Sequence, residues 1–286
     1  MILVTGASGH LGELIINNLL QKVSPDEFVA LTRNEAKAAE LQAKGINTRI
    51  GDFDQPETME RAFQGIDKAL IISTMSPNRY EQQAAVVDAA KRAGVKHLIY
   101  TGVTIKDVSL SVLKAHMDTH FQTEDYIRNN GFTYTFLRNS LYAEVIPLHA
   151  GEKVFEHGIN LPGGEGKVSY ALRSEMAEAA ANVLAGEGHE NKVYHITGAE
   201  LYSYREVAET LTSLSGKQVL YRDADEATFV SNLLQAGVPQ RIAVIKNGFA
   251  VDIKHGLYEV VSPDLENLLG RKPALLKEML KQIYHL

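Results

Sequence analysis

The fold class is decided by a stretch near the start of the chain, Thr5-Gly6-Ala7-Ser8-Gly9-His10-Leu11-Gly12. A short apolar run over residues 2–5 precedes its glycines, and a helical pattern over residues 11–20 follows. Glycines at this spacing between a strand and a helix allow a tight turn, a close approach to a pyrophosphate and close helix packing. The N–H groups at the helix start favour negative charge. The stretch therefore predicts dinucleotide binding, and a merely structural glycine turn is the alternative.

Strands and helices alternate through the rest of the first half. Further strands are predicted at residues 28–32, 47–51, 68–73, 97–101 and 133–138, and helices at 35–44, 55–65, 82–93 and 114–129. Strands that alternate with helices of this length indicate a parallel sheet covered on both faces. The predicted class is therefore α/β, a Rossmann-type doubly wound parallel sheet with a smaller, mainly helical C-terminal lobe.

The pattern loosens after Asn139. Residues 158–166, rich in Gly and Pro, predict a loop, and strands are expected at 168–172 and 192–197. Helices are predicted at 174–185, 226–236, 263–269 and 273–284, and a further helix ends at Gly216 after a capping box that starts at Ser203. We expect a Rossmann domain over residues 1–140, to which 168–197 return, and a small lobe over 141–167 and 198–286.

Composition excludes several classes of protein. The 286 residues include 29 Lys and Arg against 35 Asp and Glu, a net charge of −6, and no Cys. The chain therefore has no disulfide, thiolate metal site or cysteine nucleophile. Its mild acidity, without a long block of Lys and Arg, argues against binding to the phosphate backbone of nucleic acid, which needs a basic face. There is no signal-peptide pattern, and the most apolar run, residues 69–72, is far shorter than the roughly 20 residues that span a bilayer. A cytoplasmic protein is expected.

The end of the second predicted strand concerns the choice of cofactor. NAD-binding folds carry an acidic residue there for the ribose 2′-hydroxyl, but this chain has Arg33, with Lys37 one turn into the next helix. Because a guanidinium can bind a phosphate through two parallel hydrogen bonds, this favours NADP(H) over NAD(H). The alternative is that Arg33 is a solvated loop charge. Asp52 and Phe53 follow the third strand, where an adenine would be met, and an ordinary turn is the alternative there.

Other candidates lie where later strands end. Ser73, Thr74 and Met75 follow the fourth strand, where a nicotinamide would lie, and Thr101 ends the fifth. Loop or core roles are the alternatives for these side chains. The predicted cofactor-binding residues are Thr5, Gly6, Ser8, Gly9, His10, Leu11, Gly12, Arg33, Lys37, Asp52, Phe53, Ser73, Thr74, Met75, Thr101 and Asn139.

Four stretches together resemble the NmrA-like, atypical short-chain dehydrogenase/reductase family, and within it the NAD(P)H-quinone oxidoreductases and triphenylmethane reductases. They are residues 5–12, Leu31-Thr32-Arg33-Asn34, Gly51-Asp52-Phe53 and Thr135-Phe136-Leu137-Arg138-Asn139. The similarity covers essentially the whole chain. It implies an NADP(H)-binding Rossmann domain and a small lobe that closes over an aromatic acceptor, with contacts from Asn139 and Tyr142. The family contains both enzymes and catalytically silent redox sensors.

The helix predicted at 114–129 departs from the wider superfamily, whose extended members carry Tyr-x-x-x-Lys here. When the Glu that follows this motif is aligned on Glu124, His116 takes the Tyr position and His120 the Lys position. Because the Tyr–Lys pair moves the proton at an alcohol or ketone, its absence argues against epimerisation and alcohol oxidation. His116 and His120 are candidates to line the acceptor pocket and supply a proton, with packing as the alternative. They share a helix face, but no third ligand is evident, so no metal site is predicted.

We therefore expect an NADPH-dependent reductase that transfers hydride directly to a flat, electron-poor aromatic acceptor of the quinone, triphenylmethane or azo dye class. The candidate substrate pocket comprises Phe53, Met75, His116, His120 and Tyr142. The alternative is a non-catalytic protein that senses the state of NADP(H), and a nucleotide-sugar epimerase has less support. The expected partner is a small aromatic acceptor rather than nucleic acid or a membrane, and a homodimer is one option.

Overall fold

The structure is a computed structural model that describes residues 1–151 and 153–286, which separate into two compact units. Unit 1 comprises Met1–Val103, Asp118–Arg138 and Ser174–Tyr194, and unit 2 comprises Thr104–Met117, Asn139–Arg173 and His195–Leu286. Residues 104–117, expected in the first domain, thus lie in unit 2. The predicted domain boundaries stay a prediction, because compact packing does not show which segments fold alone.

A seven-stranded sheet forms the centre of unit 1, with the strand order β3-β2-β1-β4-β5-β6-β9. Strand β1 pairs in parallel with β2 and β4, β2 with β3, and β4 with β5. The strands are β1 Ile2–Val4, β2 Phe28–Thr32, β3 Asn47–Ile50, β4 Lys68–Ile71, β5 His97–Val103, β6 Thr133–Asn139 and β9 Lys192–Ile196. The order reverses at β1, so the carboxyl ends of β1 and its two neighbours open the crevice where doubly wound folds bind ligands.

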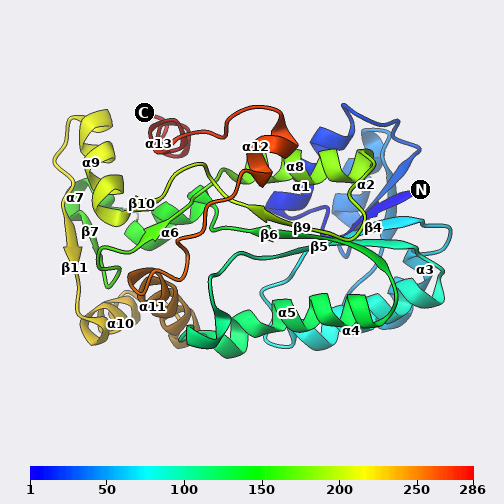
Figure 1. The fold of residues 1–286 in the computed structure, drawn as a ribbon, viewed down its shortest axis with the longest axis horizontal. Coiled ribbons are helices and arrows are strands. Elements are labelled where there is room, and N and C mark those ends of the chain that lie inside the picture. Colours follow the sequence, from blue (N-terminus) through cyan, green and yellow to red (C-terminus); the bar gives the residue numbers. More distant parts are fainter. Residues whose placement is uncertain (152) are drawn as a thin grey trace. The chain divides into compact units, whose positions relative to one another are not determined.

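Helices cover both faces of this sheet, α1 and α8 on one and α3, α4 and α5 on the other (Figure 1). They are α1 His10–Leu19, α2 Glu35–Ala43, α3 Pro56–Ala62, α4 Arg79–Arg92, α5 Lys114–Asn129 and α8 Arg173–Ala185. Buried side chains such as Phe63, Val86 and Phe136 form the core against α3, α4 and α5. Helix α4 starts three residues before the predicted residue 82, because its polar first turn, which includes the buried Arg79, carries no apolar period. None of the described helices is long and apolar enough to cross a membrane.

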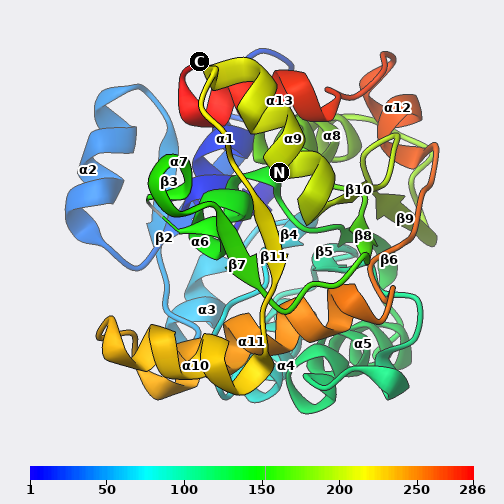
Figure 2. The ribbon, with the colours of Figure 1, turned by 90° about the vertical axis from the view of Figure 1, so that its left-hand side faces the viewer.

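Unit 2 consists of short strands and helices. The strands are β7 Ile159–Leu161, β8 Lys167–Val168, β10 Tyr202–Ser203 and β11 Tyr221–Asp223. The helices are η1 Val108–Leu110, η2 Ala143–Val145, α6 Ile146–Ala150, α7 Val154–His157, α9 Tyr204–Ser215, α10 Glu226–Gln235, α11 Gln240–Lys254, α12 Asp264–Leu269 and α13 Leu276–Tyr284. Strand β7 pairs in parallel with β11, as Figure 2 shows, and β8 pairs antiparallel with β10.

Two expectations for this unit were wrong, and one long helix was missed. The predicted loop 158–166 contains β7, which lies beside β11 because Gly158 has no Cβ; one there would lie 2.4 Å from the Leu220 carbonyl oxygen. The strand expected at 168–172 is only β8, two residues long. Helix α11 was not predicted at all. Gly248 interrupts its pattern, and a Cβ at Gly248 would lie 2.5 Å from the Leu113 side chain, so packing requires a residue that weakens the helical signal.

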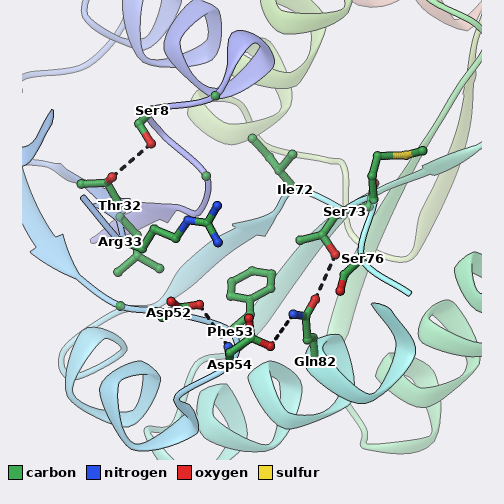
Figure 3. A pocket seen from close by; sticks show the side chains of 16 residues that line it. Ser8, Thr32, Arg33, Asp52, Phe53, Asp54, Ile72, Ser73, Ser76 and Gln82 are labelled. Carbon is green, nitrogen blue, oxygen red and sulfur yellow. Dashed lines mark hydrogen bonds between the residues drawn. The ribbon is translucent and has the colours of Figure 1, made fainter. Parts of the chain in front are cut away.

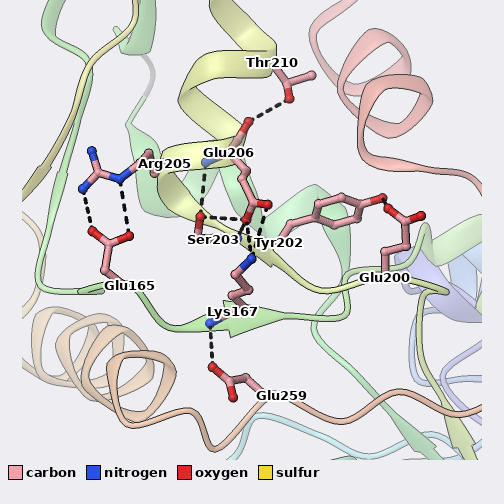
Figure 4. Close-up of polar contacts among 9 residues, drawn as sticks. All are labelled: Glu165, Lys167, Glu200, Tyr202, Ser203, Arg205, Glu206, Thr210 and Glu259. Carbon is pink, nitrogen blue, oxygen red and sulfur yellow. Dashed lines mark hydrogen bonds and ion pairs between the residues drawn. The ribbon is translucent and has the colours of Figure 1, made fainter.

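The predicted capping box at the start of α9 is confirmed. The Ser203 hydroxyl accepts from the Glu206 N–H at 3.2 Å, and the Glu206 carboxylate accepts from the Ser203 N–H at 2.7 Å (Figure 4). The same carboxylate pairs with Lys167 at 3.3 Å. These contacts join β8 to the start of α9, whereas the Arg205–Glu165 pair beside them is exposed on both sides.

Candidate functional site

The predicted glycine turn links β1 to α1 and depends on two glycines for its shape. Gly6 has φ +61°, a conformation that L-residues rarely adopt. At Gly12, a Cβ would lie 2.1 Å from the Gly6 carbonyl oxygen, so only glycine lets α1 come this close to the turn. Gly9 is the N-cap of α1 and provides no side-chain cap. The first N–H groups of the helix are therefore left for a ligand rather than satisfied by a capping side chain.

A cavity of about 510 Å³ opens beside this turn, entirely within unit 1. It is lined by Gly6, Ser8, Gly9, Leu31, Thr32, Arg33, Gly51, Asp52, Phe53, Asp54, Ile72, Ser73, Thr74, Met75, Ser76 and Gln82. These residues lie at or just after the ends of β1, β2, β3 and β4, and Gln82 comes from α4, so the cavity lies at the carboxyl ends of the strands. This is where doubly wound sheets place their ligands.

Nine of the predicted cofactor-binding residues line the cavity: Gly6, Ser8, Gly9, Arg33, Asp52, Phe53, Ser73, Thr74 and Met75. Thr5, His10, Leu11, Gly12, Lys37, Thr101 and Asn139 are not among the lining residues. Thr5 instead supports the wall, because its hydroxyl accepts from the Ile72 N–H at 2.9 Å. In the same way, the Thr101 hydroxyl accepts from the Ser73 N–H at 2.9 Å.

The two predicted cations differ in their surroundings. The Arg33 guanidinium points into the cavity between Ser8 and Phe53 (Figure 3), and within residues 1–151 and 153–286 it has neither an ion-pair nor a hydrogen-bond partner. Lys37 pairs with Glu40 at 2.7 Å on the exposed surface of α2, and this contact raises its pKa. Arg33 is therefore the cation that a bound anion would meet.

At the floor of the cavity, hydrogen bonds join three side chains in an arrangement that the sequence did not predict. The Gln82 amide donates to the Asp54 carboxylate at 2.6 Å, and its oxygen accepts from the Thr74 hydroxyl at 3.1 Å (Figure 3). Gln82 is buried. Its amide thus ties the loop after β3 to the loop after β4, which are the predicted adenine and nicotinamide ends of the site.

The two histidines predicted to supply a proton lie in different units. His120, in unit 1, is buried, with Nε2 2.5 Å from the Arg79 guanidinium and Nδ1 2.8 Å from the Tyr100 hydroxyl. Burial lowers the pKa of Arg79 and raises that of Tyr100. His116 lies in unit 2. Neither His lines the described cavity, and their role in proton supply stays a prediction.

Two further predicted residues also belong to unit 2. The Asn139 amide lies 3.5 Å from the Tyr142 hydroxyl. The Arg173 guanidinium carbon lies over the Tyr142 ring, 4.7 Å from the ring centroid. Burial raises the pKa of Tyr142. Their contacts with cofactor or acceptor stay predictions. No group of three His, Asp or Glu side chains in the described ranges could hold a metal ion.

These residues fit a phosphorylated dinucleotide. The cradle that Gly6 and Gly12 shape, the uncapped start of α1 and the cation at the end of β2 are features that dinucleotide-binding proteins of the Rossmann type combine. The comparison with protein families agrees. The model of the NmrA-like family matches residues 1–280, and the chain belongs to that family.

Relatives match this chain over most or all of its length. Quinone oxidoreductase 2 of Escherichia coli (strain K12) is 36% identical over 288 residues, which cover 100% of this chain and 99% of the relative. NAD(P)H azoreductase of Xenophilus azovorans is 31% identical over 266 residues, 92% of this chain and 88% of the relative. The crystal structure of Citrobacter sp. triphenylmethane reductase complexed with NADP(H) has a TM-score of 0.91 and 37% identity, and covers 99% of each chain.

Proposed function

We propose that this protein is an NADPH-dependent reductase that transfers hydride directly to a flat, electron-poor aromatic acceptor, such as a quinone, a triphenylmethane dye or an azo dye. The observation that carries the proposal is the Arg33 guanidinium, which faces the cavity where NAD-binding folds have a carboxylate. The relatives support the acceptor class, since their names cover a quinone oxidoreductase, an azoreductase and a triphenylmethane reductase.

Different residues of the cavity would bind different parts of the cofactor. The turn from Gly6 to Gly9 and the start of α1 would bind the pyrophosphate, and Arg33 the 2′-phosphate. Bound NADPH supplies the hydride. The loop after β4, which Thr101 and Gln82 hold from either side, would orient the nicotinamide end. The protein thus contributes proximity and orientation, and this chemistry needs no Tyr–Lys acid pair.

The test is to mix the purified protein with NADPH and follow the absorbance of the reduced nicotinamide. Benzoquinone, malachite green and an azo dye are then added in separate reactions. Oxidation of NADPH that depends on one of these acceptors supports the proposal. Tight NADPH binding with no oxidation by any of them would refute it and favour a non-catalytic sensor of NADP(H).

The cofactor is tested separately through Arg33. In Arg33→Ala we expect NADPH to bind at least tenfold more weakly, with little change for NADH, because a charge-assisted bidentate contact is lost. Lys37→Ala is the matched control, since Glu40 already pairs with this cation, and it should change NADPH binding by less than about twofold. Equal losses for both cofactors in Arg33→Ala would remove Arg33 from the 2′-phosphate.

Two finer expectations belong to the proposal. The first is a homodimer, which size-exclusion chromatography with light scattering would detect as twice the mass of one chain. A cytoplasmic location would be measured by cell fractionation.

A further inference from the structure

Thr32, the last residue of β2, carries a buried hydroxyl beside the cavity. Its side chain is only 2% exposed. The hydroxyl donates to the Ser8 hydroxyl oxygen at 3.1 Å and accepts from the Asn34 N–H at 3.1 Å. One side chain thus holds both the glycine turn after β1 and the turn after β2.

Each of these bonds places a group on the cavity wall. Because the Ser8 oxygen accepts from Thr32, the Ser8 hydroxyl keeps its own hydrogen for another acceptor. On the other side, the bond to the Asn34 N–H sets the backbone around Arg33, and Asn34 caps α2 by accepting from the Lys37 N–H at 3.1 Å. The backbone that carries the Arg33 side chain is therefore fixed by the hydrogen bonds of Thr32 before it and of Asn34 after it.

Ser8 and Arg33 face the same part of the cavity (Figure 3). In the part of the chain that the structure describes, no acceptor takes the Ser8 hydrogen and no carboxylate meets the Arg33 guanidinium. Both side chains can donate, so the group that would satisfy them together is an anion with several acceptor oxygens. A phosphate monoester has this chemistry, and a ribose hydroxyl does not.

We infer that Thr32 is a positioning residue for the choice between NADPH and NADH, because its hydroxyl aims Ser8 and fixes the start of Arg33 for one phosphate. The inference rests on the proposed function and deepens it. It makes the selectivity a property of three side chains, Ser8, Thr32 and Arg33, of which Thr32 does not need to touch the cofactor.

The test is equilibrium binding of NADPH and NADH to the full chain by isothermal titration calorimetry. Thr32→Val keeps the shape and the β-branched side chain but removes both hydrogen bonds. We expect it to weaken NADPH about fivefold to tenfold and NADH by less than about twofold, the scale of one hydrogen bond to a charged group. Thr32→Ser, which keeps the hydroxyl, should restore most of the NADPH affinity.

A double-mutant cycle tests whether Thr32 acts through Ser8. Ser8 is exposed, so Ser8→Ala should fold normally and weaken NADPH by a similar factor. If Thr32 acts mainly by aiming Ser8, both changes remove the same contact. The variant that carries Thr32→Val and Ser8→Ala should then bind NADPH about as well as whichever single variant has the lower NADPH affinity. Losses that multiply, or an unchanged NADPH affinity in Ser8→Ala, would overturn the inference.

The binding readout separates this inference from the proposed reaction. Equal weakening of both cofactors in Thr32→Val would show a structural role alone and overturn the inference. If the wild-type protein prefers NADPH but reduces no acceptor, the reductase proposal fails while the role of Thr32 stands. If the wild-type protein binds the two cofactors equally well, the inference about Thr32 fails, whether or not the protein reduces an acceptor.

Discussion

Gly12→Ala tests whether the absence of a side chain at Gly12 is what lets α1 approach the glycine turn. The new Cβ would lie 2.1 Å from the Gly6 carbonyl oxygen and 2.9 Å from the Cα of Ala7, whereas ordinary contact begins at 3.4 Å. Both neighbours are backbone atoms, so no side chain can rotate away. The start of α1 would have to move by about 1 Å, which a close-packed interior resists.

The size of the effect follows from what α1 buries. Leu11, Ile15, Ile16 and Leu19 all pack into the protein, so a shift of the helix disturbs each of these contacts. Overpacking of this kind costs about 1–3 kcal/mol of the free energy of unfolding. For a chain of this length we expect the melting temperature to fall by about 5 °C. The displaced turn should also weaken NADPH binding by about tenfold or more.

The measurement is thermal unfolding by far-ultraviolet circular dichroism, together with calorimetric titration of NADPH. Gly9→Ala is the matched control for stability. Its Cβ would lie 3.3 Å from the same Gly6 oxygen, which a few tenths of an ångström would relieve, and its backbone has φ −86°. We expect its melting temperature to stay within about 2 °C of wild type. A Gly12→Ala protein with wild-type stability and NADPH affinity would refute this account of the turn.

Two further predictions concern the floor of the cavity and acid stability. Gln82→Leu removes the amide that joins Asp54 and Thr74. Because the loop after β4 then loses its support, we expect kcat for acceptor reduction to fall about tenfold. A kcat within twofold of wild type would contradict this. Burial lowers the pKa of His97 and of His149 from 6.5 to about 4. Between pH 6.5 and pH 4 the unfolded chain therefore binds more protons than the folded protein. The melting temperature should be steady above pH 7 and fall from pH 6.5 towards pH 4. A melting temperature that does not change between pH 6.5 and pH 4 would contradict the burial of the neutral rings.

The first half of the fold could be predicted from sequence because its patterns are local. Each of the six predicted strands from residues 2 to 138 is observed, with ends that differ by a few residues at most. Buried parallel strands form continuous apolar runs, and each of the helices α2 to α5 has a glycine within three residues after its end. In unit 2, β8 and β10 have two residues each, so there is no period to detect. Their positions depend on tertiary packing.

The same distinction holds for the site. Residues such as Ser8, Arg33 and Asp52 could be predicted because the carboxyl ends of parallel strands meet at one edge. Gln82 was missed because it lies in a helix, and only the packing of α4 brings its amide to the cavity. Thr32 was missed for another reason. A threonine at the end of a strand looks like an ordinary β-branched residue, and its hydrogen bonds to two other segments cannot be read from one stretch of sequence.

The contacts of His120 bear on its predicted role as a proton donor. A guanidinium can only donate, so Nε2 of His120 accepts from Arg79, and its Nδ1–H then donates to the Tyr100 hydroxyl. In this arrangement Nε2 carries no hydrogen to give, and its lone pair already accepts from Arg79. An acceptor that needed a strong acid from this side chain would require the network to open. Hydride transfer to a triarylmethane cation needs no proton, and a quinone can take its protons from water, so neither reaction depends on a proton from His120.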